Sequence, residues 1–322
     1  NIYRKFLIRY LLITAGVLCL IAGINFVIDP GGIYLKKILN DKYVDEYTNK
    51  LISAKTAIRS FDNERMVKMS LAGKAIGYDC IILGSSHMMS LSVITRPSSL
   101  KEMCPSVMNL GVSGGGFEDL LIFSHRILHK NLFQRELSGK TILIGIDPWL
   151  FKWEMDSRYG IFRDYLSMIK EELHVSDSMV TEPYLMKLLK NLINFNYIKE
   201  SIKLIKRTGT KNPFRVVAPQ RQLSEYMPVA AVNYDAGFEY AVTLPDGSHL
   251  YDSNYIRSNK TSETYIADGD YKLSGSLYDE EVIGIFKKLL SVFKQRGFKI
   301  VFVLPPYHYT VFRQSNEKNW RY

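Results

Sequence analysis

A short apolar run that ends on glycine, hydroxyl and imidazole side chains constrains the fold of this chain more than any other feature. Residues Cys80–Leu83 are apolar without alternation, which is the pattern of a strand buried on both faces of a parallel sheet. Gly84 ends the run, and Ser85, Ser86 and His87 follow directly. Because ligands of open α/β sheets bind at the carboxyl ends of the strands, this pattern predicts a site at the turn. Helix capping is the alternative role for a serine at such a position.

Three further apolar segments predict the rest of the same sheet. These strands are predicted at residues 107–110, 141–146 and 299–304, and helices at 117–130 and 278–296. Strands that alternate with helices are typical of a doubly wound parallel sheet. The intervening residues 151–275 do not continue the alternation. We therefore predict an α/β fold in which this helical and irregular insertion covers one edge of the sheet and helps to shape a cleft.

An uncharged stretch near the N-terminus predicts a membrane anchor. Tyr10–Ile28 contains nineteen residues without a formal charge, which is long enough to cross the hydrocarbon core of a bilayer. Arg4, Lys5 and Arg9 precede this stretch. The positive-inside rule therefore places the N-terminus in the cytoplasm and the remaining chain outside it. Two lysines after the stretch weaken this charge asymmetry. A cleaved signal peptide and a buried core helix are the alternatives. The run is longer than a typical signal-peptide core, and no small-residue cleavage site follows it.

The predicted organisation has three parts. Residues 1–32 form the anchor, residues 33–75 a polar helical stalk, and residues 76–322 the α/β domain with its insertion. The sequence starts with Asn1 and stops at Tyr322 soon after a predicted strand. We therefore expect that the C-terminal part of the domain lies beyond this sequence.

Charge and cysteine content narrow the partners and the compartment. The formal net charge of +10 suits an anionic partner, but nothing in the sequence resembles a nucleic-acid motif. The explanations of the charge that remain are binding to anionic lipid, binding to acidic glycan, or a solvated basic surface. Of the three cysteines, Cys19 lies in the predicted anchor. A disulfide between Cys80 and Cys104 would suit an oxidising compartment, whereas a small core side chain is the simpler role for Cys80.

Metal and nucleotide sites are not predicted. His125 and His129 have the spacing of metal ligands on a helix, but no third ligand is evident, so a solvated helix face is the preferred interpretation. The glycine-rich segment 111–116 lacks the spacings of the dinucleotide and phosphate-binding loops. We therefore expect neither a cofactor nor a metal.

Three of the predicted strands end on motifs that one reaction could use together. The motifs are Gly-Ser-Ser-His at 84–87, Asn-Leu-Gly-Val-Ser-Gly-Gly at 109–115 and Gly-Ile-Asp-Pro at 145–148. Acyl transfer needs a nucleophile and oxyanion donors around one carbon, and parallel strands bring their ends to one edge. The arrangement resembles the SGNH (GDSL-like) hydrolase superfamily, especially its membrane-anchored bacterial branches that act on cell-envelope polysaccharides and exopolysaccharides.

The resemblance implies a three-layer α/β/α, flavodoxin-like sheet and a set of catalytic residues. Ser86 takes the place of the nucleophile, and its backbone N–H that of one oxyanion donor. Gly114 takes the place of the second donor, with Gly115 as the alternative register. Asp147 falls at or beside the asparagine that supplies the third donor in that superfamily.

Two departures from the superfamily affect these assignments. An ionised Asp147 cannot donate a hydrogen bond to an oxyanion. The last motif of the superfamily, Asp-x-x-His, does not occur after Leu304. His308 follows the last predicted strand and is the candidate base in this sequence, beside a histidine beyond Tyr322. His87 is interpreted as an ordinary surface histidine because adjacent side chains usually point apart.

The expected function is ester hydrolysis or acyl transfer, for example of acetyl groups, on a cell-envelope polysaccharide outside the cytoplasm. The alternative is a catalytically inactive glycan-binding protein that works with polysaccharide-assembly partners. Trp149, Phe151 and Trp153 are expected either to stack on a sugar ring or to pack in the core.

Overall fold

The computed structural model describes residues 2–28, 41–53, 55–59, 64–94, 99–129, 138–153, 242–250 and 278–305, with short stretches at 169, 192–193, 198–199, 201–202 and 227–228. Two compact units are present. One contains Asn1–Asp41 and Met155–Gln220, and the other contains Lys42–Glu154 and Arg221–Tyr322. Most of the predicted insertion and His308 lie outside the described residues.

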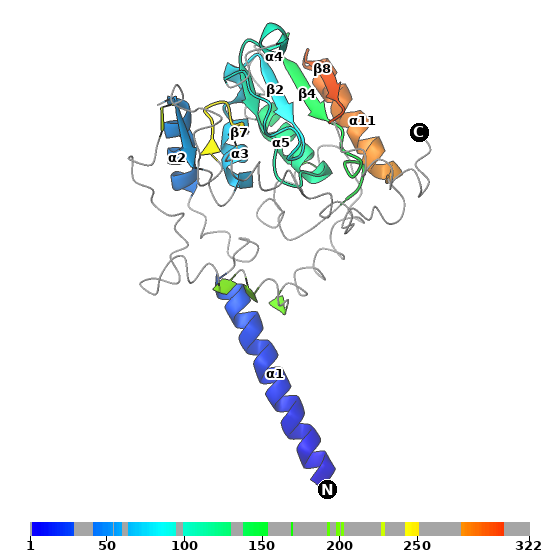
Figure 1. The fold of residues 1–322 in the computed structure, drawn as a ribbon. Helices are drawn as coiled ribbons and strands as arrows, with labels where there is room; N and C mark the ends of the chain where they lie inside the picture. Colours follow the sequence, from blue (N-terminus) through cyan, green and yellow to red (C-terminus); the bar gives the residue numbers. More distant parts are fainter. Residues whose placement is uncertain are drawn as a thin grey trace, which may run out of the picture. The chain divides into compact units, whose positions relative to one another are not determined.

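A four-stranded parallel sheet organises the second unit, which confirms the predicted mixed α/β fold with a parallel sheet (Figure 1). Its order is β3-β2-β4-β8. The strands are β2 (Cys80–Leu83), β3 (Val107–Asn109), β4 (Thr141–Gly145) and β8 (Lys299–Val303). Every residue of β2, β3 and β4 is buried, as their apolar sequences without alternation predict. The polar motifs that follow β2, β3 and β4 therefore belong to one edge of the sheet.

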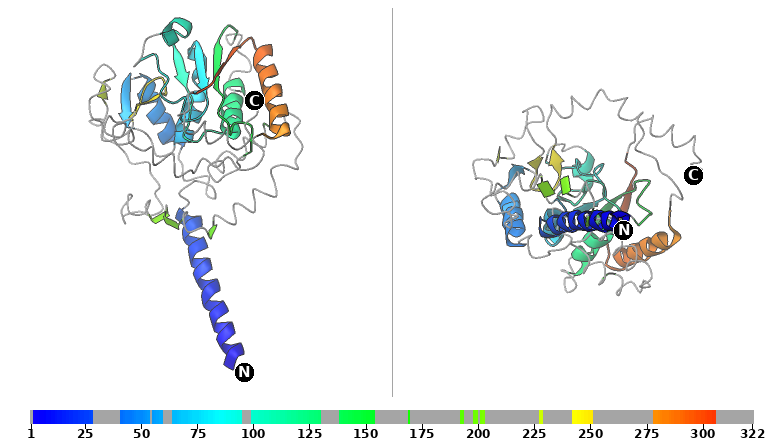
Figure 2. Two further views of the ribbon diagram at one scale, coloured as in Figure 1. Left: turned by 45° about the vertical axis from the view of Figure 1, so that its right-hand side comes forward. Right: turned by 90° about the horizontal axis from the view of Figure 1, so that it is seen from below.

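Helices α5 (Phe117–His129) and α11 (Glu280–Gln295) pack together beside this sheet (Figure 2). Phe286 of α11 lies edge-on to Phe117 of α5, with 6.5 Å between ring centroids, and 6.1 Å from the ring of Phe302 on β8. Helix α11 begins where the Asp279 side chain accepts a hydrogen bond from the N–H of Glu281. The apolar residues of α11 recur at helical spacing and are buried, so this helix is held mainly by the core.

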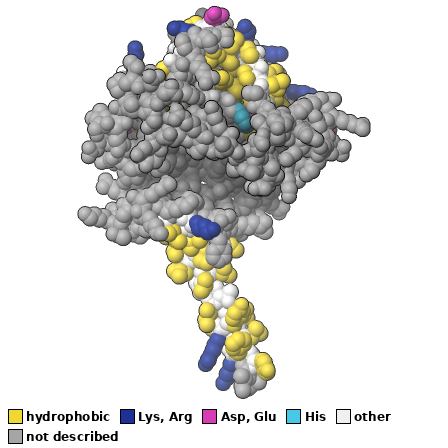
Figure 3. Space-filling model, in the orientation of Figure 1, with side chains coloured by type: hydrophobic (Ala, Val, Ile, Leu, Met, Phe, Trp, Pro, Cys, Tyr) yellow, Lys and Arg dark blue, Asp and Glu magenta, His cyan; other side chains and the backbone are white. Residues whose placement is uncertain are grey.

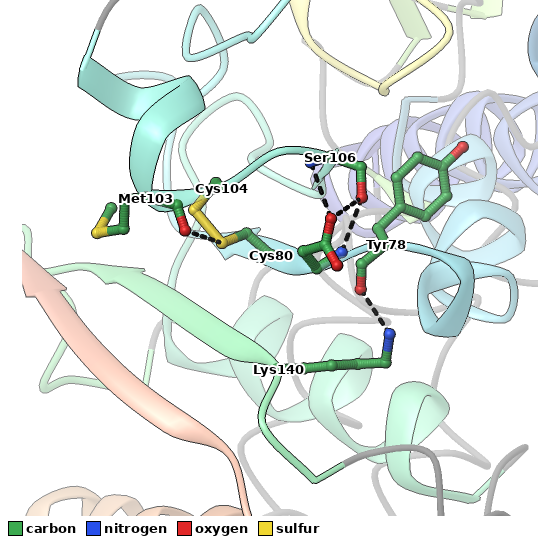
Figure 4. Close-up of a disulfide and its surroundings, with 7 residues drawn as sticks. Tyr78, Cys80, Met103, Cys104, Ser106 and Lys140 are labelled. Carbon is green, nitrogen blue, oxygen red and sulfur yellow. Dashed lines mark hydrogen bonds between the residues drawn. A yellow bond between two sulfur atoms is a disulfide. The ribbon is translucent and has the colours of Figure 1, made fainter.

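The opposite side of β2 is covered by residues that include the short helix α4 (Ser99–Met103). Cys104 directly after α4 forms a disulfide with Cys80, the first residue of β2, with 5.5 Å between their Cα atoms (Figure 4). Both cysteines are buried, so Cys80 is a core residue and also half of a disulfide. The Lys140 ammonium donates to the Tyr78 carbonyl at 2.8 Å close by. The disulfide thus lies at the end of β2 that is remote from the candidate site.

A second, antiparallel sheet has the order β5-β1-β6-β7 and was not predicted. Its strands are β1 (Thr56–Arg59), β5 (Met227–Pro228), β6 (Val242–Thr243) and β7 (His249–Leu250). The predicted stalk at 33–75 contains the helices α2 (Asp41–Ser53) and α3 (Glu64–Ala72), as its pattern indicated, but β1 lies between them and pairs with β5 and β6. The helical prediction is wrong for β1 because its partners lie more than 160 residues away in the sequence.

Helix α1 (Ile2–Ile28) has the length and composition of a membrane-spanning segment. Among the described residues it is the one helix with these properties. Apolar side chains cover its surface, and basic side chains lie near its N-terminal end (Figure 3). Only 11% of its most apolar window is buried, unlike a core helix, whereas a signal sequence meets the same criteria as an anchor.

Candidate functional site

Three turns meet at the carboxyl edge of the parallel sheet. They follow β2, β3 and β4, and glycines allow their close approach. A Cβ atom on Gly115 would lie 2.7 Å from the Gly84 carbonyl oxygen, and one on Gly84 would lie 3.3 Å from the Cα of Gly145. Such distances leave no room for a side chain between the backbones. The structure therefore brings together the three strand ends that the sequence singled out.

Each pair of turns is also joined by a hydrogen bond from a side chain. The bonds run from Asn109 Nδ2 to Met88 O (2.7 Å), from Trp149 Nε1 to Gly115 O (3.0 Å), and between His87 Nδ1 and Asp147 Oδ1 (3.0 Å). Asn109 is fully buried and also accepts from the N–H of Gly111 at 2.8 Å. Because these bonds join segments from three different strands, the turns form one cross-linked unit rather than three independent loops.

His87 and Asp147 form the polar centre of this unit. The Asp147 side chain is 2% exposed and the His87 side chain is 29% exposed, so the carboxylate is buried behind the imidazole. A carboxylate at Nδ1 favours the tautomer that carries its proton there and its lone pair on Nε2. The Trp149 ring lies 5.8 Å from the imidazole at a tilt of 41°. The histidine is thus oriented by two residues of the β4 turn.

The interpretation of His87 as an ordinary surface histidine is wrong. Residues 86–90 form turns, with the N–H of Met88 bonded to the Ser85 carbonyl, instead of continuing as a strand. The side chain therefore reaches across the end of β2 to β4. The contact between His87 and Asp147 could have been inferred from the register of the sheet. Parallel pairing of β2 with β4 places the residues that directly follow the two strands at the same level.

The two serines of the first turn have different surroundings. Ser85 is fully buried, and its Oγ accepts from the N–H of His87 at 3.2 Å and lies 3.1 Å from His87 Nδ1. Ser86 is only partly buried, and its side chain makes no hydrogen bond to the described part of the chain. Ser85 therefore holds the turn, and Ser86 presents the more accessible hydroxyl. The nucleophilic role of Ser86 stays a prediction.

The glycine turn after β3 contains both candidates for the second oxyanion donor. Gly114 is exposed and has a φ of 56°, a conformation that favours glycine. The N–H of Gly115 is bonded to the Val112 carbonyl within the turn, at 3.1 Å. The Gly115 N–H is thus engaged within the turn, and the role of Gly114 as the second oxyanion donor stays a prediction.

Asp147 occupies a different chemical position from the asparagine of the resembled superfamily. Its carboxylate faces His87 and acts as an acceptor there. An ionised carboxylate accepts hydrogen bonds and cannot donate one to an oxyanion, whereas the contact of Asp147 with His87 fixes the orientation of that ring.

Of the three aromatic residues after β4, Trp149 lies at the candidate site, whereas Phe151 and Trp153 pack against other aromatic rings. Trp153 packs against Phe117, with ring centroids 5.4 Å apart, and Phe151 against Phe286 at 5.3 Å. These two belong to the core around α5 and α11. Trp149 alone of the three contacts the site, through His87 and the Gly115 carbonyl.

An Asp-x-x-His sequence also occurs at Asp246–His249, with Asp246 in the turn between β6 and β7 and His249 at the start of β7. The two side chains have different partners. The Asp246 carboxylate accepts from Ser92 and Ser248, whereas His249 Nε2 lies 3.4 Å from Thr243 Oγ1. His249 Nδ1 is buried and has no hydrogen-bond partner in the described structure. This pair therefore lacks the geometry of a carboxylate that orients a catalytic histidine.

Burial controls the ionisation of this segment. It lowers the pKa of His249 to about 3, assisted by the charge of Lys68, and it raises the pKa of Asp246 against the hydrogen bonds from Ser248 and Ser92. Lys68 is fully buried and donates to the carbonyls of Asn109 and Gly247 at 2.9 and 2.5 Å. Its pKa is lowered to about 8 by burial, which the charges of Glu64 and Asp246 oppose. Lys68 thus ties the β6–β7 turn to the end of β3.

The described residues contain no group of three His, Cys, Asp or Glu side chains that could hold a metal ion. The rings of His125 and His129 lie 4.2 Å apart on α5. His125 is only 6% exposed, so the prediction of a solvated helix face is wrong for this residue, because α5 is covered on that side.

Comparisons of the chain with protein-family models, curated proteins and solved structures found no match. The site is therefore interpreted from its own geometry.

Proposed function

We propose that this chain carries an SGNH-like acyl-transfer site, with a flavodoxin-like α/β/α architecture, which hydrolyses or transfers acyl esters such as acetyl groups on a cell-envelope polysaccharide. The observation that supports this best is the contact between His87 and Asp147 in a cross-linked set of turns that also contains Ser86 and Gly114. A nucleophile candidate, an oriented histidine and exposed backbone donors at one sheet edge are the parts that acyl transfer requires.

In the proposed reaction, Ser86 Oγ bonds to the acyl carbonyl carbon while its proton passes to His87 Nε2. Asp147 stabilises the resulting imidazolium, and the N–H groups of Ser86 and Gly114 bind the oxyanion. The ester C–O bond then breaks, and the sugar oxygen leaves with the proton from His87. Water or a second sugar hydroxyl then attacks the acyl carbon and loses its proton to His87. The bond between the acyl carbon and Ser86 Oγ breaks, Ser86 Oγ takes the proton back from His87, and a carboxylic acid or a new ester is released.

The proposal replaces His308 by His87 as the base. His87 lies in the described cluster and has a carboxylate partner, whereas His308 lies outside the described residues. In an unliganded enzyme the hydrogen bond between nucleophile and base is often long and shortens only with substrate. The absence of a hydrogen bond at Ser86 Oγ among the described residues is compatible with that behaviour.

A second candidate function is glycan binding without turnover, as part of a polysaccharide-assembly system. A specific observation favours it: the position expected to supply a third oxyanion donor carries Asp147, which accepts instead. The loss of one such donor typically reduces the rate by about a hundredfold to a thousandfold. Trp149, beside the imidazole, would provide a stacking surface for a sugar in either function.

A serine-reactive fluorophosphonate probe distinguishes the two functions. We expect the full chain, purified in detergent, to be labelled at Ser86 and the Ser86→Ala variant to remain unlabelled. Ser90→Ala is the matched control because Ser90 is exposed and lies four residues further along the same turn region. A folded wild-type chain that takes no label would contradict the acyl-transfer proposal and favour the glycan-binding one.

A further inference from the structure

Two adjacent residues of α3, Glu64 and Arg65, hold the glycine turn of the candidate site from outside the parallel sheet. The N–H of Ser113 donates to Glu64 Oε2 at 2.9 Å, and Arg65 Nη2 donates to the carbonyl of the same Ser113 at 3.0 Å. Both polar backbone groups of Ser113 are therefore bound by side chains of one helix. No pattern in the sequence connects the predicted stalk with the site.

The other end of the turn is held by the ion pair that Arg65 makes. Arg65 Nε and Nη2 donate to the two carboxylate oxygens of Asp119 at 2.8 and 2.9 Å, and Asp119 Oδ2 also accepts from the N–H of Gly116 at 3.2 Å. The chain of bonds thus runs from the Ser113 carbonyl through Arg65 and Asp119 to Gly116. It encloses Gly114 and Gly115, which carry no side chains of their own to fix them.

Burial makes this arrangement a strong constraint. The side chains of Arg65 and Asp119 are 9% and 3% exposed, so their bidentate contact is little screened by water. Removing one member of such a pair leaves an uncompensated buried charge, which makes the pair costly to disrupt. A glycine-rich turn would otherwise sample many backbone conformations.

We propose that Arg65 and Glu64 are positioning residues of the acyl-transfer site, which fix the backbone of the Ser113–Gly116 turn so that the Gly114 N–H is preorganised for the oxyanion. Neither residue contacts the reacting atoms. They act through the turn, which lies against the Gly84–Ser86 segment at the Gly115 contact. This inference rests on the proposed function, because oxyanion stabilisation depends on donors that are oriented before the reaction begins.

The test measures the concentration dependence of fluorophosphonate labelling in the full chain, which separates the maximal labelling rate from the half-saturating probe concentration. Arg65→Lys keeps the charge but cannot reproduce the planar fork that binds Asp119 and Ser113 together. We expect its maximal rate to fall by about tenfold to a hundredfold, a part of the loss expected for a missing donor, with the half-saturating concentration within about twofold of wild type. Glu64→Ala removes the bond to the Ser113 N–H together with the attraction between the Glu64 carboxylate and Lys68, and it should show the same pattern more weakly.

Asp79→Asn is the matched control. The Asp79 carboxylate also accepts a backbone N–H, that of Ser106 at 3.1 Å, but it lies beside the start of β2, at the opposite edge of the sheet. Its maximal rate should stay at the wild-type value. Folding of every variant is checked by its thermal midpoint, and Glu64→Ala serves as the decisive variant if Arg65→Lys does not fold.

The outcomes separate the two proposals. Labelling of folded Arg65→Lys and Glu64→Ala at the wild-type maximal rate overturns the positioning role and leaves the acyl-transfer proposal intact. Labelling that falls equally in Asp79→Asn also overturns it, because the effect would then follow general stability. A folded wild type that takes no label overturns both.

Discussion

A histidine whose Nδ1 is hydrogen-bonded to a buried carboxylate is fixed in its orientation by that bond. His87 meets this condition through Asp147, and Ser85 closes the turn that carries it. Sequence reasoning identified Ser86, Gly114 and Asp147 as candidates but missed His87. The reason is physical. Adjacent side chains of an extended chain point to opposite sides, whereas the tight turn after Gly84 directs the His87 side chain toward the turn after β4. Side-chain direction in a turn depends on backbone angles that a sequence pattern does not encode.

A second histidine allows a prediction about pH. Burial lowers the pKa of His249 to about 3, so the folded protein keeps this ring neutral while the unfolded chain binds a proton near pH 6.5. The stabilisation is therefore complete above pH 6.5 and is lost as the pH falls toward 3. Between pH 7 and pH 5 this residue should reduce the free energy of unfolding by about 2 kcal/mol.

The contribution of His249 is measured as a difference between the wild type and His249→Gln, which does not titrate. Urea unfolding of both proteins at pH 7, 6 and 5 should give a steeper loss of stability in the wild type. All other ionisable groups are the same in both proteins, so their contributions cancel in the comparison. Parallel pH profiles would mean that the His249 ring is protonated or solvated in the folded state.

Local patterns were enough to predict the elements of the parallel sheet. The predicted strands at 107–110 and 141–146 became Val107–Asn109 and Thr141–Gly145, because a strand covered on both faces needs an uninterrupted apolar run that can be read directly. The strand predicted at 299–304 became Lys299–Val303, whose residues are half-buried or exposed. The antiparallel sheet could not be read in this way. Its strands are two to four residues long, and β1 meets β6 only through folding of distant segments. Short strands of this kind are stabilised by tertiary pairing rather than by their own periodicity.

Replacement by alanine should have opposite effects on stability at Gly115, in the turn after β3, and at Gly284, in α11. Gly115→Ala would place a Cβ atom 2.7 Å from the Gly84 carbonyl and 3.0 Å from the Cα of Ser85, so two backbone turns must separate. We expect a loss of about 1–3 kcal/mol of stability. Gly284 lies inside α11 with no atom within 4 Å of its Cβ position, and Gly284→Ala should stabilise the protein by up to about 1 kcal/mol.

Thermal unfolding of the two variants tests whether the contact between turns is real. The midpoint of Gly115→Ala should fall, and its fluorophosphonate labelling should fall with it, because the separated turns include the one that carries Ser86. The midpoint of Gly284→Ala should rise while labelling is unchanged. A Gly115→Ala variant as stable as wild type would show that the turns after β2 and β3 are not in close contact.

At the scale of the whole molecule, the apolar helix α1 and the disulfide both bear on which compartment holds the α/β domain. Disulfides form and persist in oxidising environments, so the pair Cys80–Cys104 agrees with a domain outside the cytoplasm. Arg4, Lys5 and Arg9 in the N-terminal part of α1 agree with an N-terminus that stays inside. We propose this orientation from the two features together, because each depends on a different physical cause.

The three cysteines of the chain report the orientation directly. In a domain exported to an oxidising compartment, Cys80 and Cys104 are bonded and only Cys19, which is free in α1, can react with a maleimide–polyethylene glycol reagent after denaturation without a reductant. We expect one mass increment for the chain expressed in a bacterial host, and three after reduction. Replacing Arg4, Lys5 and Arg9 by glutamate removes the positive charge that retains the N-terminus, so a fraction of the chains should insert in reverse and take three increments without reductant. Three increments in the unmodified chain would place the domain in a reducing compartment and contradict the proposed orientation, and with it the assignment of an extracytoplasmic polysaccharide as substrate.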